Sequence, residues 1–124
     1  AGQTLPSNLQ SVAFGHDFNR SLNGVTLPSC LESISFGHDF DQNLTDVKWP
    51  SSLQSLTFGH NFNQNLEHWM LPGGMRTLIF GHRFNQSLDG VTLPSNLQSL
   101  IFGYAFNRRL YKVIPELNVL QTLL

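Results

Sequence analysis

One dipeptide, Phe-Gly, returns five times in this chain at an unvarying spacing of 22 residues. Self-similarity at a fixed period of this length is the signature of a repeat architecture. Seven apolar columns keep the same spacing, and seven apolar residues in 22 are too few for one unit to fold alone. Stacking the units merges the columns into one continuous core. In the third unit the seven columns are occupied by Trp49, Leu53, Leu56, Phe58, Phe62, Leu66 and Trp69.

Each unit contains one short segment with the periodicity of a strand. Apolar and polar residues alternate over 55–58, which predicts a strand with Leu56 and Phe58 inside and Ser55 and Thr57 outside. The Gly after each Phe permits a sharp exit from the strand, through either positive φ or close backbone approach. The arc that returns to the next strand, such as 84–94, is too short and too rich in Asn, Ser, Asp and Gly for a regular helix. We therefore expect irregular chain there, with turns or 3₁₀ turns.

Residues 93–107 read Leu-Pro-Ser-Asn-Leu-Gln-Ser-Leu-Ile-Phe-Gly-Tyr-Ala-Phe-Asn, and four earlier segments repeat this pattern. The pattern resembles the FNIP repeat, a 22-residue unit similar to a leucine-rich repeat. It departs from the family after Phe-Asn, where Ser-Leu or Asn-Leu replaces an apolar residue and Pro. The resemblance implies a leucine-rich-repeat-like solenoid and a role in protein interaction, with no activity attached to the repeat itself.

The expected fold is mainly β: a leucine-rich-repeat-like solenoid with one short parallel strand per rung, spanning 1–124 as a single domain. Its rungs cover about 4–25, 26–47, 48–69, 70–91 and 92–113. Residues 114–124 should form a degenerate sixth rung or cap, because Leu120-Gln121-Thr122-Leu123 echoes Leu-Gln-Ser-Leu one residue late. Neither end carries the polar capping repeat of a free solenoid. We therefore expect a piece of something longer, or ends that partners cover.

Composition argues for a protein partner. The formal net charge is −1 and only 12% of residues are charged, so neither nucleic acid nor a membrane surface is indicated as a partner. No stretch approaches the ~18 to 20 apolar residues that span a bilayer. Ser, Asn and Gln supply much of the polarity, and short uncharged side chains lose water at low cost, which suits a face that packs against another protein. The lone Cys30 cannot form an internal disulfide.

The residue after Phe-Gly forms a column of histidines that ends in a tyrosine. Neighbouring imidazoles would lie one strand spacing apart, close enough for two to approach a metal ion. A straight column with Asp17, Asp39, Asn61 and Arg83 beside it should not gather three ligands around one point. We therefore expect no metal and no cofactor, and lowered pKa values from repulsion between stacked imidazolium groups. This His column consists of His16, His38, His60, His82 and Tyr104.

A second polar column follows the second Phe of each rung. In a leucine-rich-repeat-like stack, such side chains should turn inward and bond to the backbone of their own and the next loop. Two of the three N-glycosylation sequons, which begin at Asn19, Asn43 and Asn85, use a column Asn. A buried Asn cannot carry a glycan, so these sequons are interpreted as accidental. This Asn column consists of Asn19, Asp41, Asn63, Asn85 and Asn107.

The outward face of the strands is the candidate binding surface. Its side chains are small and uncharged, and they become more apolar toward the C-terminal rungs. Regular Ser and Thr can also match an ice lattice, but only Thr57 and Thr77 are threonine among the mixed residues of this face, so a protein partner is favoured. The residues of this strand face are Ser11, Ser33, Ser35, Ser55, Thr57, Thr77, Ile79, Ser99 and Ile101, with Ala13 beside them.

No catalytic constellation stands out, so we expect no enzyme. The repeat is broken at Glu67-His68-Trp69-Met70 and Gly73-Gly74, and local substitution explains these positions better than an active site does. Two functions remain: a recognition module that uses the strand face, or a structural subunit docked in a larger assembly, including a complex in an organellar membrane. A metal-binding or ice-binding column is a more remote alternative. A basic patch, Arg108, Arg109 and Lys112, offers a contact for an acidic partner.

Overall fold

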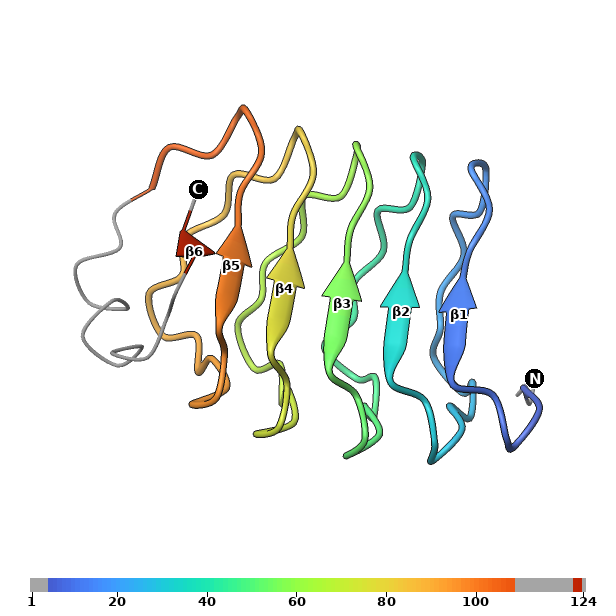
Figure 1. The fold of residues 1–124 in the computed structure, drawn as a ribbon. Helices are drawn as coiled ribbons and strands as arrows, with labels where there is room; N and C mark the ends of the chain where they lie inside the picture. Colours follow the sequence, from blue (N-terminus) through green and yellow to red (C-terminus); the bar gives the residue numbers. More distant parts are fainter. Residues whose placement is uncertain (1–4, 109–121, 124) are drawn as a thin grey trace.

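The computed structural model describes residues 5–108 and the strand at 122–123. Six short strands form one parallel sheet in sequence order, and the return arcs that connect the first five strands lie behind the sheet (Figure 1). The predicted mainly β solenoid is thereby confirmed, and a sixth strand pairs with the fifth at the position that the degenerate echo predicted. The strands are β1 (Ser11–Ala13), β2 (Ser33–Ser35), β3 (Ser55–Thr57), β4 (Thr77–Ile79), β5 (Ser99–Ile101) and β6 (Thr122–Leu123).

The first five strands pair in a register of 22 residues, so each column of the sequence becomes a row of stacked side chains. Leu56 of β3, for example, lies between Ile34 and Leu78. Leu56 is fully buried, and so is Phe62 in the following segment. Because one unit covers the core of the next, the described residues of the second to fourth rungs are more deeply buried than those of the first.

Two backbone features shape each rung, a turn before the strand and a close contact after it. The Pro carbonyl accepts a hydrogen bond from the amide three residues later, as between Pro50 and Leu53 at 3.1 Å, which forms the corner before the strand. At the other end of the strand, a Cβ added to Gly59 would meet the backbone of Gly37. Among the described residues, positive φ at glycine is confined to Gly24 and Gly90. The Gly of Phe-Gly is therefore required for close approach between rungs.

The return arcs consist of turns and irregular chain, closed by backbone bonds such as Val25 N–H to Leu22 carbonyl at 3.0 Å. These bonds join residues three apart and form single turns, and no 3₁₀ helix occurs among the described residues. Nor does the described part of the chain contain a helix with the length and apolar character needed to cross a membrane.

Candidate functional site

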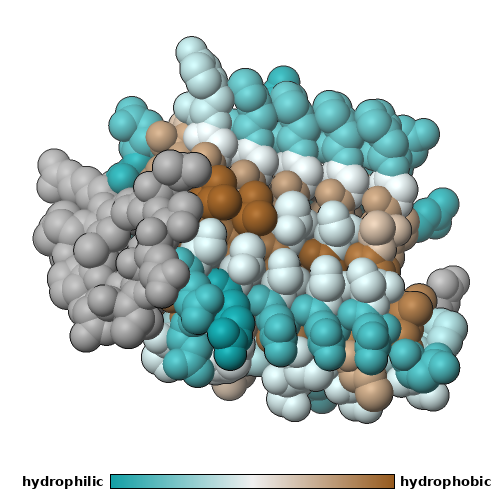
Figure 2. Space-filling model, viewed as in Figure 1, coloured by the Kyte–Doolittle hydropathy of each residue, from teal (hydrophilic) through white to brown (hydrophobic). Residues whose placement is uncertain are grey.

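The strand face is a nearly uncharged surface of small side chains. Its residues on β2 to β5 are all half-buried, and Ser11 on β1 is exposed. Ile79 on β4 pairs in register with Ile101 on β5, so the two isoleucines lie side by side. Figure 2 shows a hydrophobic patch over these strands, with hydrophilic side chains along both ends of the strands. The sequence placed these residues on one face, and the structure brings them together there.

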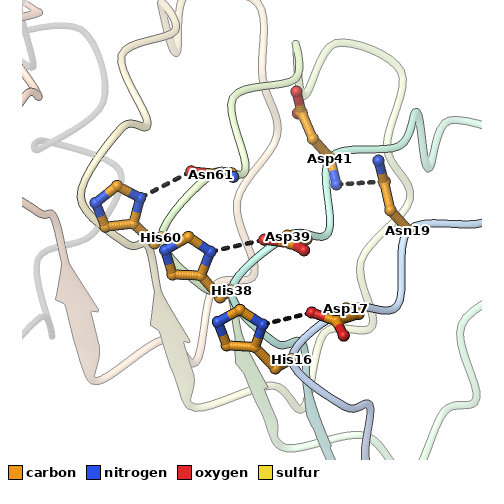
Figure 3. Close-up of polar contacts among 8 residues, drawn as sticks. All are labelled: His16, Asp17, Asn19, His38, Asp39, Asp41, His60 and Asn61. Carbon is orange, nitrogen blue, oxygen red and sulfur yellow. Dashed lines mark hydrogen bonds and ion pairs between the residues drawn. The ribbon is translucent and has the colours of Figure 1, made fainter.

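The Asn column links successive rungs through side-chain acceptors. The Asn63 Oδ1 atom accepts hydrogen bonds from the Asn85 backbone N–H and from the Gln86 side-chain amide, both at 2.9 Å. The same arrangement joins Asn19 to Asp41 and Gln42 (Figure 3 draws the first contact). The residue after each column Asn is thus a second linking position that sequence reasoning missed. Its repeated Gln at 42, 64 and 86 was the available signal.

The predicted inward orientation of the Asn column is wrong. Asn19, Asn63 and Asn107 are exposed, and Asp41 and Asn85 are half-buried. The preceding Phe of each rung points into the core, and the next side chain of an extended segment points the other way. Burial therefore gives no ground for dismissing the sequons at Asn19 and Asn85.

Removing one link of this column should weaken the stack measurably. We expect Asn63→Ala to destabilise the folded chain by about 1–2 kcal/mol, because the Asn85 N–H and the Gln86 amide lose a shared acceptor. Urea unfolding followed by circular dichroism measures this change. Asn65→Ala, which removes only a local acceptor for the Glu67 N–H, is the control. An equal loss in both variants would contradict a linking role for Asn63.

The His column is stacked in register. Ring centroids lie 4.7 Å apart between His16 and His38, 4.6 Å between His38 and His60, and 4.7 Å between His60 and His82. The first three imidazoles each place Nδ1 beside the side-chain oxygen of the next residue, at 2.7, 2.7 and 2.8 Å from Asp17, Asp39 and Asn61 (Figure 3).

Two expectations about this column are corrected. Ligand atoms of His16, His38 and Asp39 all lie within 4.8 Å of one another, so the structure does bring three potential ligands together. The strand register continues into the loop, where the Asp39 N–H bonds to the His16 carbonyl at 3.0 Å and places Asp39 beside His16. The pKa of His16 is raised, mainly by its hydrogen bond to Asp17, and not lowered by its stacked neighbour.

A proton titration checks this correction. In metal-free protein we expect the His16 pKa to exceed the ordinary value of about 6.5, because the Asp17 carboxylate favours imidazolium. A raised folded pKa means that this pair stabilises the fold at pH values below about 6.5 and loses its effect as the pH rises through the folded pKa. Imidazole NMR signals of the parent chain and of Asp17→Asn measure the shift. A His16 pKa below 6.5 in the parent would restore the original expectation.

The remaining candidates do not form a catalytic group among the described residues. Arg108 is exposed and its Nε donates to the Asn85 carbonyl at 3.2 Å, while Arg109 and Lys112 of the basic patch lie outside the described residues. His68 has a positive φ of 70°, at the turn position that Gly24 and Gly90 hold in other rungs. The Glu67-His68 irregularity is thus a substitution within the turn. A cavity of about 260 Å³ lies beside Phe14 and Phe18 at the β1 end.

Comparison with known proteins agrees with this geometry. The solved structure of CroV588, described as a novel circular LRR protein, is similar to the chain with a TM-score of 0.64 and 30% sequence identity. The similarity covers 96% of this chain and 24% of CroV588, so the chain spans about a quarter of that protein's length. Among curated proteins, no sequence matches the chain. The model of the FNIP Repeat matches three segments, 1–39, 40–83 and 84–121. The chain belongs to the FNIP repeat family.

Proposed function

We propose that this chain is a non-catalytic interaction module whose strand face binds another protein. Repeat solenoids of this kind generally serve as scaffolds for protein interaction, because stacked rungs build an extended and regular surface. One observation carries the choice of face. Ile79 and Ile101 lie side by side and half-buried on neighbouring strands, within a row of small uncharged side chains.

The chemistry of this face favours a partner with a predominantly apolar, uncharged surface. Ser and Thr hydroxyls can exchange hydrogen bonds with water for bonds to a partner, and they carry no charge that must be desolvated. The isoleucines add apolar area at one end of the face. Such a patch with a polar rim matches the usual anatomy of protein interfaces.

The first experiment isolates the chain under native conditions and measures the size of the particle that carries it. A free monomer that binds its partner reversibly supports the recognition module. A large particle of fixed composition supports the structural subunit instead, and its other chains then identify the assembly. Photo-crosslinking from position 57 tests whether the partner contacts the strand face in either case.

A double substitution tests the face itself. We expect Ile79→Lys with Ile101→Lys to weaken partner binding at least tenfold, since two ammonium groups would replace the apolar side chains of the patch. Met70→Lys is a matched control, because Met70 is 84% exposed on a return arc away from the strands. Binding is measured by pull-down and by titration calorimetry with the co-purified partner. Unchanged binding by the double variant, with its melting temperature preserved, would rule out this face.

A further inference from the structure

The first two rungs present a group of metal-binding side chain types in fixed register. His16 and His38 stack with ring planes 9° apart, and the Asp39 N–H bonds to the His16 carbonyl. Ligand atoms of these three residues all lie within 4.8 Å of one another. Their side chains are partly open to solvent, at 70% exposed for His16, 43% for His38 and 37% for Asp39. An ion can therefore reach them without any opening of the core.

The carboxylates lie on the Nδ1 side of the imidazoles, which identifies the ligand atoms. Each Nδ1 lies 2.7 Å from a carboxylate oxygen, of Asp17 or of Asp39. Because Asp39 lies on this side of His38, an ion shared by Asp39 and the two imidazoles would replace the Nδ1 protons, and each ring would keep its proton on Nε2. Backbone bonds between the loops also hold neighbouring imidazoles in place before any ion arrives.

Along the His column, the charge beside each imidazole changes from rung to rung. Asp17 and Asp39 are anionic, Asn61 is neutral and Arg83 is cationic. The first pair of rungs therefore attracts a cation, and the last His of the column has a cation next to it. The ring geometry hardly changes over the same distance, with centroid spacings of 4.7 Å at both ends of the histidine stack. Charge is thus the variable that separates the two pairs.

We propose that His16, His38 and Asp39 bind one divalent transition-metal ion such as Zn²⁺. Imidazole nitrogen and carboxylate oxygen are both normal zinc ligands at about 2.0–2.2 Å. Adjacent ligands of a tetrahedral ion lie closer together than 4.8 Å, so small side-chain rotations must draw the three inward. A fourth position stays open to water or to a side chain of a bound partner. The site lies on the loops after β1 and β2 and is separate from the proposed strand face.

Titration calorimetry of the untagged chain with ZnCl₂ at pH 7.5, after chelator treatment, tests the site. We expect one tight ion per chain, and at least a tenfold loss of affinity for His38→Ala. His82→Ala removes an equally stacked imidazole beside Arg83, and His68→Ala removes one outside the column. Both controls should bind as the parent does. The circular dichroism spectrum and melting temperature of each variant show that it is folded.

A gain of binding provides the converse test. Arg83→Asp should give His60 and His82 the carboxylate that His16 and His38 have in Asp39, and raise the stoichiometry from one ion to two. Two results would overturn the proposal: parent-like affinity in His38→Ala, or an equal loss in His38→Ala, His82→Ala and His68→Ala. The second result would mean scattered binding to surface histidines.

Discussion

Gly59→Ala should destabilise the chain by at least about 3 kcal/mol, the upper range for forcing an added group into a packed site. A Cβ on Gly59 would stand 2.6 Å from the Gly37 carbonyl carbon and 3.1 Å from the His38 backbone nitrogen. These atoms belong to the backbone of the preceding rung, so no side-chain rotation can relieve the contact. The second and third rungs must move apart, and the sheet between them loses its register.

Gly15→Ala is the matched control, because Gly15 occupies the same column in the first described rung. A Cβ added there meets no atom within 4 Å. The control should therefore leave stability within about 1 kcal/mol of the parent, with a slight gain from the reduced freedom of the unfolded chain. Thermal and urea unfolding followed by circular dichroism compare the two variants. Similar losses in both would show that the column requires glycine for its backbone conformation and not for the contact between rungs.

The strands and the core were predictable because both follow from local alternation and an exact repeat. Leu56 alternates with Ser55 and Thr57 in sequence, and stacking at 22 residues covers it with Ile34 and Leu78. Neither inference requires the path of the loops. The reason why Gly follows Phe in each rung could not be decided from the sequence. Positive φ and close backbone approach both remained possible, since sequence spacing does not show how closely two backbones approach.

The loops after the strands were harder to predict. The orientation of Asn63 depends on Phe62, whose inward side chain turns the next residue to the surface. The grouping of His16, His38 and Asp39 was not predicted, because Asp39 follows His38 in sequence while a backbone bond to the neighbouring rung also places it beside His16. A repeated sequence predicts contacts between residues at the same position of adjacent rungs. It does not predict contacts between residues at different positions of adjacent rungs.

The second large effect on stability is expected for the stacked Phe rings of the core. Phe62→Ala should cost about 3–5 kcal/mol, the usual range for truncating a buried Phe. The Phe62 side chain is fully buried. Its ring centroid lies 4.0 Å from that of Phe58 and 6.2 Å from those of Phe40 and Phe84, so the truncation leaves a cavity bordered by three rungs. Stability is measured by urea unfolding, with Phe62→Leu as a variant that retains most of the volume and should lose less than half as much.

Phe18→Ala separates the effect of rung stacking from the loss of a Phe as such. Phe18 belongs to the same column, but it is only half-buried and borders the cavity of about 260 Å³ at the β1 end. Fewer contacts are lost there, and water already has access, so the cost should be clearly below that of Phe62→Ala. Equal losses of stability in Phe18→Ala and Phe62→Ala would mean that each Phe side chain is stabilised mainly within its own rung. The unequal losses that we expect would mean that contacts between rungs provide most of the stability, as a solenoid requires.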